Sequence, residues 1–341
     1  MPFLRNAWYV GAWAHEIAPG ALLGRRLLGD PVLVSRTADG MLAATSDRCP
    51  HRFAPLHRGT LVGDRVRCGY HGLEFDRAGR CVHNPHGAVP KNADLRSYPV
   101  VEQDGLVWVW MGAPERAADS APPRFDCLDR DHYAVGTGYL LGAAHYELMT
   151  DNILDLSHIQ FLHPDLGTAA VAKAAVEVRA EGDEIVCERQ MRDELLSPVL
   201  AQSYRTGGQP VDRTLSVRWQ APATMRLIVT VVPAGRPKSE SRYGSQSLHI
   251  FTPETEQTTH YFYSGSRNYE IEDDALTQKF VGALRRVFET EDKPMIEAQQ
   301  AMMGTSDLMS LHPAMLSVDA AAMRARRALA ALIAAEAETG R

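Results

Sequence analysis

Two short segments, each with one cysteine and one histidine, constrain the fold of this chain more than any other feature. The sequence CPH at residues 49–51 is followed, after sixteen intervening residues, by CGYH at residues 68–71. Proline and glycine within these segments favour tight loops. Each loop offers one thiolate and one imidazole, so a fold that brings the loops together can hold a metal centre between them.

The four side chains Cys49, His51, Cys68 and His71 match a Rieske-type [2Fe–2S] cluster, in which two cysteines bind one iron and two histidines bind the other. Neutral imidazoles in place of anionic thiolates raise the reduction potential of such a cluster. A structural zinc site is one alternative, but paired zinc ligands usually have about two to four residues between them and rarely combine Cys with His in both pairs. Only one residue separates Cys49 from His51, which disfavours zinc. Four unrelated residues would require a coincidence in both loops. The spacing therefore favours the iron–sulfur cluster.

Residues 5–111 have the pattern of an all-β module, because short apolar runs alternate with turn sequences. The runs lie at residues 31–35, 42–45 and 106–110. Residues 112–123, GAPERAADSAPP, are rich in proline and alanine and have no periodicity, which is typical of a linker. We therefore predict a first domain at residues 1–115 and a second domain at residues 116–341.

The second part of the chain mixes helical and strand patterns. Helices are predicted near residues 145–162, 274–303 and 320–337. Strands are predicted between the first two helices, at residues 184–189, 215–219, 225–232, 247–251 and 260–264. A curved antiparallel sheet covered by helices accounts for this order, so the second domain is predicted to be α+β. Residues 167–175 and 234–245 are predicted to be loops.

Polar side chains interrupt the apolar stretch at residues 145–162. Asn152, Asp155 and His158 recur every third residue and would share one face of a helix. His163 would point elsewhere on a continuous helix, but Pro164 disfavours helical geometry at His163 and favours a turn there. A turn can direct His163 back toward His158.

Two histidines and one carboxylate form the facial triad that leaves positions on Fe(II) open for O2. Two unrelated histidines at a helix end are the alternative, but polar groups without partners are costly in an apolar helix. The Asp155 carboxylate, one turn before His158, could accept the N–H of that imidazole and fix its orientation. Asn152 is a second candidate for a residue that acts close to the iron.

Charge and composition exclude several classes of function. The formal net charge of −6 provides no basic face for a nucleic acid. The first thirteen residues lack the unbroken apolar run of a secretory signal, and three arginines in residues 320–337 oppose membrane insertion. Five cysteines are an odd number, which disfavours a disulfide framework. We therefore predict a cytoplasmic protein with no nucleic-acid or membrane partner.

The sequences RCPHR at residues 48–52 and CGYHGLEF at residues 68–75 resemble the Rieske loops of aromatic-ring and O-demethylating oxygenases. RNAWYV at residues 5–10 resembles the start of the group of vanillate O-demethylase, dicamba monooxygenase and toluenesulfonate methyl-monooxygenase. This resemblance covers nearly the whole chain. It implies the terminal oxygenase component of a monooxygenase, with an N-terminal Rieske domain, a C-terminal catalytic domain of helix-grip (START-like) fold, and assembly as a homotrimer.

The resemblance also implies the third ligand of the mononuclear iron. The family has this ligand late in the chain on a long helix, and EDKP at residues 291–294 resembles that segment, so Asp292 is expected to join the two histidines. Glu289 and Glu291 are competitors that the sequence does not separate from Asp292. In the family, the aspartate at the position of Asp155 bridges to a cluster histidine of a neighbouring subunit, which here would be His71.

The family implies that electrons from NADH or NADPH reach the cluster through a separate reductase or ferredoxin, since this chain has no Rossmann glycine fingerprint. O2 and a small aromatic substrate are the other reactants. O-demethylation of a methoxylated aromatic acid, with release of formaldehyde, is the expected reaction. Hydroxylation of the ring or of a methyl group, on an aromatic carboxylate or sulfonate, is the first alternative, and a Rieske electron carrier without oxygenase activity is a more distant one.

Four residues are candidates for substrate binding. His249 matches a pocket histidine that contacts the substrate in the family, although a strand histidine with both nitrogens satisfied is an equal alternative. Arg218 and Arg226 lie on predicted strands, and one that points inward could bind a carboxylate or sulfonate at two points. Leu227 lies where dicamba-oxidising relatives carry an asparagine, a departure that argues against dicamba as the substrate.

Overall fold

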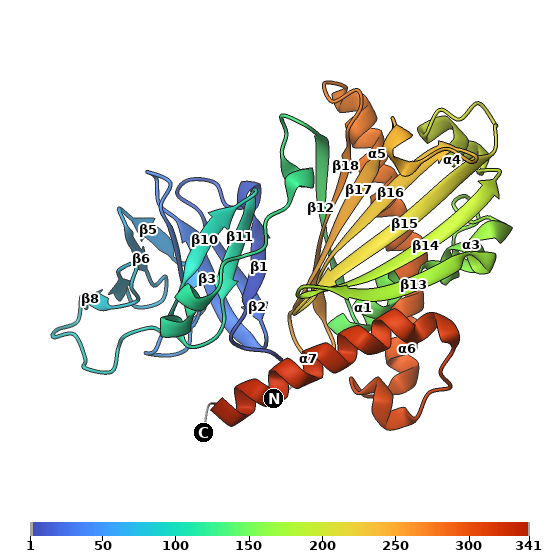
Figure 1. The fold of residues 1–341 in the computed structure, drawn as a ribbon. Coiled ribbons are helices and arrows are strands. Elements are labelled where there is room, and N and C mark those ends of the chain that lie inside the picture. Colours follow the sequence, from blue (N-terminus) through green and yellow to red (C-terminus); the bar gives the residue numbers. More distant parts are fainter. Residues whose placement is uncertain (1–2, 340–341) are drawn as a thin grey trace. The chain divides into compact units, whose positions relative to one another are not determined.

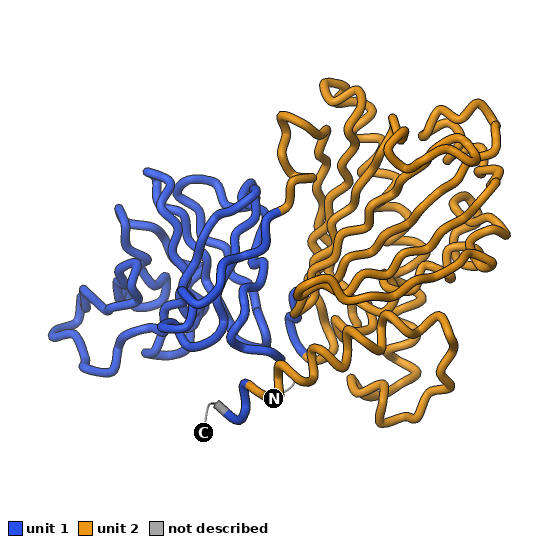
Figure 2. Tube along the Cα trace, in the orientation of Figure 1, with its two compact units in different colours: residues 1–124, 252–255, 336–341 blue, residues 125–251, 256–335 orange. Residues whose placement is uncertain are grey.

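The structure is a computed structural model in which residues 3–339 are described (Figure 1). The internal contacts of the chain divide it into two compact units (Figure 2). Unit 1 contains the chain up to Arg124, residues 252–255 and the end of the chain from Glu336, and unit 2 contains residues 125–251 and 256–335. The contact boundary thus lies at Arg124, while a domain boundary at residue 115 remains a prediction.

Unit 1 is built from three small antiparallel sheets, and all of its regular strands are short. The first sheet has the order β1 (Trp8–Trp13), β11 (Leu106–Trp110) and β10 (Val100–Gln103). The second has the order β2 (Leu22–Leu27), β3 (Asp30–Arg36), β4 (Leu42–Ser46) and β9 (Ser97–Tyr98). The third has the order β5 (Thr60–Val62), β6 (Arg65–Arg67), β7 (Glu74–Phe75) and β8 (Cys81–His83). The all-β prediction for the N-terminal domain is confirmed.

Unit 2 is organised around one seven-stranded sheet. Its order is β12 (Ala134–Gly142), β18 (Thr259–Arg267), β17 (Ser245–Pro253), β16 (Thr224–Pro233), β15 (Val211–Gln220), β14 (Glu184–Glu194) and β13 (Ala175–Glu181). Strands β13 to β17 pair antiparallel in sequence order, and the first strand, β12, pairs antiparallel with the last, β18. The predicted α+β architecture is therefore confirmed.

The helices of the second part of the chain lie between and after the strands of this sheet in the sequence, and the last of them continues past residue 335 into unit 1. They are α1 (Tyr146–Leu154), α2 (Ile159–Leu162), α3 (Ala169–Lys173), α4 (Pro198–Ser203), α5 (Asp274–Val287), α6 (Lys293–Met303) and α7 (Ala320–Thr339). Helix α5 packs closely on the sheet because the facing positions are glycines: a Cβ at Gly136 would lie 2.7 Å from Val281 Cβ, and one at Gly265 would lie 2.8 Å from Phe280 Cε1. Figure 1 shows α5 on one face of the sheet.

Two predicted helices are interrupted, and both interruptions lie at the predicted iron site. The helix expected at residues 145–162 ends at Leu154, because Asp155 adopts an extended conformation and caps a 3₁₀ turn, Leu156–His158. The helix expected at residues 274–303 contains a π-helical turn, Phe288–Asp292, directly before Pro294. Proline lacks an N–H and its ring clashes with the carbonyl four residues earlier, which accounts for the irregular turn.

Smaller differences concern the segments predicted as linker and loops. Residues 114–119 of the predicted linker form a 3₁₀ helix. Within the predicted loop at residues 167–175 the chain forms α3, and β13 begins at Ala175.

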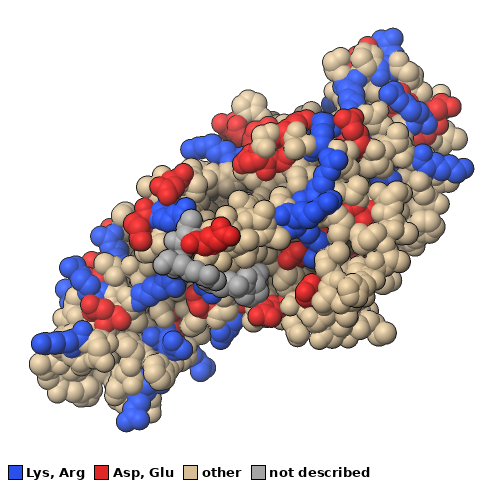
Figure 3. All heavy atoms as spheres, turned by 60° about the horizontal axis from the view of Figure 1, so that its bottom comes forward, with Lys and Arg blue, Asp and Glu red and all other residues tan. Residues whose placement is uncertain are grey.

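On the face of the molecule in Figure 3, acidic and basic side chains are interspersed. None of the helices in residues 3–339 combines the length and the apolarity that are needed to cross a membrane.

Candidate metal centres

The two Cys/His loops of unit 1 share one hydrogen-bonding frame. In the first, Phe53 N donates to Cys49 O (2.8 Å); in the second, Gly72 N donates to Cys68 O (3.1 Å). Each cysteine N–H in turn donates to the carbonyl five residues later. Both closing residues, Phe53 and Gly72, have positive φ (58° and 76°), a conformation that glycine adopts at little cost and phenylalanine does not. The matched frames place the two thiols in equivalent positions.

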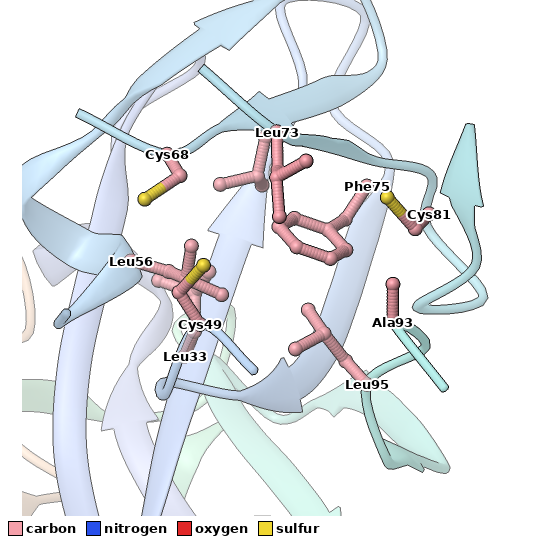
Figure 4. Close-up of a cluster of buried hydrophobic side chains, with 10 residues drawn as sticks. Leu33, Cys49, Leu56, Cys68, Leu73, Phe75, Cys81, Ala93 and Leu95 are labelled. Atoms are coloured by element: carbon pink, nitrogen blue, oxygen red, sulfur yellow. The ribbon is translucent and has the colours of Figure 1, made fainter. Parts of the chain in front are cut away.

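Cys49 and Cys68 are both buried, and their sulfur atoms point into the same space between the loops (Figure 4). Burial raises the pKa of the Cys49 thiol to about 11, and the neighbouring Cys68 thiol adds to this shift. Two thiolates at this position therefore require nearby positive charge, which a bound metal supplies. A third buried cysteine, Cys81, lies apart from this pair beyond Phe75 (Figure 4).

The histidines of the two loops lie side by side on the outer side of the thiols. The ring centroids of His51 and His71 are 4.5 Å apart at an interplanar angle of 70°. Burial, followed by the charge of His51, lowers the pKa of His71, which favours the neutral ring that binds metals. The two cysteines and two histidines are thus brought together as predicted, and their chemistry fits a Rieske cluster.

The second centre lies in unit 2, between the segment that follows α1 and the π-helical turn, Phe288–Asp292. His158, His163 and Asp292 offer ligand atoms that all lie within 4.8 Å of one another. Asp292 Oδ1 is 3.4 Å from His158 Nε2 and 3.2 Å from His163 Nε2. Burial raises the pKa of Asp292, but the hydrogen bonds from both histidines outweigh burial and hold the pKa below its usual range. The carboxylate is therefore charged and available to a cation.

Both imidazoles of this centre are oriented by a hydrogen bond at Nδ1, which leaves Nε2 directed toward Asp292. His158 Nδ1 is 2.6 Å from the backbone carbonyl of Asp155, and His163 Nδ1 is 2.7 Å from Glu291 Oε2. Such outer contacts fix the tautomer that presents Nε2 to a metal. Two nitrogens and one carboxylate oxygen on one side of a site are the donor set of a 2-His-1-carboxylate iron centre, so the residues fit that group.

The break in the helix after Leu154 determines which atom of Asp155 contacts His158. The Asp155 carboxylate was expected to accept the N–H of His158, but the backbone carbonyl of Asp155 has that role. The carboxylate instead accepts hydrogen bonds from Ser157 N (2.9 Å), Ser157 Oγ (2.8 Å) and Arg189 Nη2 (3.2 Å). Asn152 lies where it was expected, and its Nδ2 donates to Asp292 Oδ1 (3.1 Å).

Glu291 has a role that the sequence did not reveal. It was considered as an alternative iron ligand, together with Glu289 and Asp292. In the structure Glu291 contacts the outer nitrogen of His163, while Glu289 forms an exposed ion pair with Arg285. The three acidic residues differ in where the π-helical turn directs their side chains, and residue types alone do not reveal those directions.

We expect the substitution Glu291→Gln to weaken binding of ferrous iron roughly 10–100-fold, because an amide holds the His163 tautomer less firmly than a carboxylate does. Anaerobic titration with Fe(II) would measure the affinity. The matched substitution Glu289→Gln, two residues away, should leave the affinity unchanged. If the Glu291→Gln variant and the parent chain bound Fe(II) with equal affinity, the role of Glu291 in orienting His163 would be contradicted.

Strand register determines which side chains face this centre. His249 pairs with Met225, and Ser247 pairs with Leu227, so His249 and Leu227 lie on the same face of the sheet. The ring of His249 contacts Phe288 of the π-helical turn, with centroids 5.5 Å apart. This face is therefore the one that lies toward the iron site.

His249 is buried and both of its ring nitrogens have partners. Nε2 is 2.8 Å from Ser247 Oγ and Nδ1 is 2.7 Å from Tyr261 OH. Burial lowers the pKa of His249 to about 3, although the charge of Asp292 opposes this shift. His249 is therefore neutral at physiological pH and can form a hydrogen bond without carrying charge.

Arg218 and Arg226 do not share this face. Arg218 on β15 pairs with Arg226 on β16, and Arg226 pairs with Leu248 on β17. Leu248 is the neighbour of His249 in the chain, so its side chain points to the other face of the sheet. Arg218 forms ion pairs with Glu181 (2.5 Å) and Glu184 (2.6 Å), and Arg226 forms one with Asp126 (3.1 Å). The sequence left open whether either arginine points inward to bind a carboxylate or sulfonate. The period of two along a strand turns both to the opposite face, so their candidacy for substrate binding is corrected.

Comparisons with known proteins agree with this pair of centres. Residues 7–99 match the family described as "Rieske [2Fe-2S] domain", and residues 143–335 match "Vanillate O-demethylase oxygenase C-terminal domain". The chain is 40% identical to the oxygenase component of dicamba O-demethylase from Stenotrophomonas maltophilia, over 96% of this chain and 97% of that protein. It is 38% identical to an iron-sulfur subunit of the toluene-4-sulfonate monooxygenase system of Comamonas testosteroni, over 88% of this chain and 89% of that protein.

Solved structures of dicamba monooxygenase resemble this chain over nearly its whole length. A crystal structure of dicamba monooxygenase bound to 3,6-dichlorosalicylic acid matches with a TM-score of 0.92 at 39% identity, over 98% of this chain and 99% of that chain. Another structure of that enzyme, with non-haem iron and dicamba, matches with a TM-score of 0.84. The cofactors are accordingly a Rieske [2Fe–2S] cluster and a mononuclear iron. This chain belongs to the Rieske non-haem iron oxygenases with a vanillate O-demethylase type catalytic domain, as an oxygenase component.

Proposed function

We propose that this chain O-demethylates a small methoxylated aromatic acid and releases formaldehyde, with Cys49, His51, Cys68 and His71 as ligands of the cluster and His158, His163 and Asp292 as ligands of the iron. The observation that carries the proposal is the convergence of two Nε2 atoms and one carboxylate oxygen beside the face of His249. The similarity to the dicamba O-demethylase component over nearly the whole chain supports the same reaction type.

When bound, the ferrous iron supplies activation of O2 with electrons from the cluster. The protein side chains position the substrate and exclude water. Tyr261 and Phe288, both buried, form an aromatic wall beside Asp292. Neutral His249 could bind a polar substituent of the substrate by exchanging its Nε2 contact with Ser247 Oγ, and Leu227 offers an apolar contact. A methoxy carbon that gains a hydroxyl group becomes a hemiacetal, which separates into formaldehyde and a phenol.

A second reaction is supported by the similarity to the toluene-4-sulfonate monooxygenase subunit: hydroxylation of a methyl group on an aromatic sulfonate or carboxylate. The two reactions share every group in the iron site and differ only in the bond attached to the oxidised carbon. A panel of methoxylated and methylated aromatic acids, with a surrogate reductase, distinguishes them. Release of one formaldehyde per O2 from a methoxylated acid supports O-demethylation, whereas a benzylic alcohol without formaldehyde supports hydroxylation.

Membership among oxygenase components of multi-component systems implies a separate electron donor. We propose that a reductase or ferredoxin supplies electrons from NAD(P)H, that the chain acts in the cytoplasm, and that it assembles as a homotrimer. In that assembly Asp155 would link His158 of one subunit to His71 of the next. The Asp155 side chain is about one-fifth exposed (22%), so it is accessible to such a partner.

The substitution Asp155→Asn tests the proposed electron route. The amide still accepts hydrogen bonds from Ser157 and Arg189, so both metals should remain bound, while turnover should fall roughly 10–100-fold because the bridging charge is lost. Iron content, cluster absorption and turnover are measured on the same sample. Unchanged turnover with full metal content would contradict the route.

A further inference from the structure

We infer that Arg189 is a positioning residue for the mononuclear iron, because it closes the segment that carries both histidine ligands. We call residues 155–171 the histidine segment: it begins at Asp155, contains His158 and His163, and ends at Val171 in α3. This inference rests on the proposed ligand set and does not depend on which substrate is oxidised.

One guanidinium group contacts both ends of the histidine segment. Arg189 Nη2 lies 3.2 Å from Asp155 Oδ1 and Nη1 donates to the Val171 carbonyl at 2.8 Å. Arg189 belongs to β14, against which α3 lies (Figure 1). The planar fork of arginine presents donors in fixed directions, so a single side chain can hold two acceptors at a set separation. The ends of the segment are therefore fixed relative to the sheet.

The environment of Arg189 favours this arrangement. Its side chain is only 4% exposed, and the charged group beside it is Asp155. A buried cation is costly unless it is paired and hydrogen-bonded, so loss of either contact leaves an unfavourable charge in the interior. Arg189 pairs with Leu215, Leu215 pairs with Val229, and Val229 pairs with Ser245. Ser245 is four residues before His249 on the same strand, so the Arg189 side chain comes from the face of the sheet on which His249 lies.

The interior of the histidine segment is already compact, so fixing its ends fixes the ligands. The N–H groups of Leu166 and Gly167 both donate to the carbonyl of His163. A Cβ at Gly167 would lie 2.6 Å from Gln160 Cα, so the segment folds back on itself at van der Waals distance. Because such a segment moves as a unit, the contacts of Arg189 at its two ends set the positions of both imidazoles. Preorganised ligands bind a metal with less loss of conformational entropy.

The decisive experiment measures metal affinity, without turnover. The full-length protein is purified with its cluster, the mononuclear site is emptied with a chelator, and Fe(II) is titrated anaerobically against a competing chromophore. We expect Arg189→Met to bind Fe(II) roughly 10–100-fold more weakly than the parent chain while its cluster absorption is unchanged. Arg189→Lys keeps the charge but reaches one acceptor at a time. Its affinity for Fe(II) should therefore lie between those of Arg189→Met and the parent chain.

Two controls make the result specific. Arg192→Met removes another ion-paired arginine of β14, one whose side chain is 70% exposed and pairs with Asp212, and it should bind Fe(II) like the parent chain. His158→Ala removes a proposed ligand and should lose the metal; if it does not, the ligand set fails rather than the role of Arg189. Parent-like affinity in Arg189→Met, with or without a lower melting temperature, overturns the inference. If Arg189→Met does not fold, parent-like affinity in Arg189→Lys overturns it.

Discussion

Replacing Asp292 by alanine is expected to abolish turnover and to remove the mononuclear iron while leaving the cluster in place. Asp292 is the carboxylate shared by both histidines, at 3.4 Å and 3.2 Å from their Nε2 atoms, and it is buried. Alanine leaves two imidazoles and no anion, a donor set that holds ferrous iron poorly. Iron should fall from about three atoms per chain to about two, with turnover lower by about 10³-fold or more.

The matched control for this experiment is Glu289→Ala, on the same π-helical turn. Glu289 is exposed and pairs with Arg285, so its loss should leave iron content and turnover near those of the parent chain. Iron analysis, the visible spectrum of the cluster and formaldehyde release are compared for all three proteins. An Asp292→Ala variant that keeps its full iron content would show that the proposed ligand set is wrong.

Replacing Cys68 by alanine is expected to remove the cluster, and with it the colour of the protein. Cys68 is buried beside Cys49, and no other buried thiol lies between the two loops in the described part of unit 1. Without the fourth ligand the cluster is lost, so iron should fall to about one atom per chain and electron supply should stop. Unit 1 should also unfold more readily, because binding of a metal centre contributes to folding.

Cys81→Ala provides the control for the cluster prediction. Cys81 belongs to the same hydrophobic core and is about as buried as Cys68, but it lies beyond Phe75. Its loss should cost about 1 kcal/mol of stability, as for other small truncations in a core, and should leave the cluster spectrum intact. Visible absorption and the reduced-state EPR signal report the cluster in both variants. Loss of the cluster in Cys81→Ala, or its retention in Cys68→Ala, would contradict the assignment.

The proposed ligands of the two centres illustrate what each level of structure contributes. Cys49, His51, Cys68 and His71 could be grouped from the sequence because ligands within one loop are close together in the chain. His158 and His163 could be grouped for the same reason. Asp292 is more than a hundred residues away from both, so residue types alone left it in competition with Glu289 and Glu291. Family resemblance selected it, and the π-helical turn gives the physical reason.

Local residue patterns were sufficient where neighbours in the chain determine the outcome: the β-rich first part, the strand runs of the second, and the two Cys/His loops. Only the tertiary structure decided which strand face Arg218 and Arg226 occupy, which atom of Asp155 orients His158, and that Arg189 holds the ends of the histidine segment. Each depends on register or on a break in a helix. A shift of one residue in a strand, or a break in a helix, redirects a side chain entirely, and the competing arrangements differ by packing between segments that are distant in the sequence.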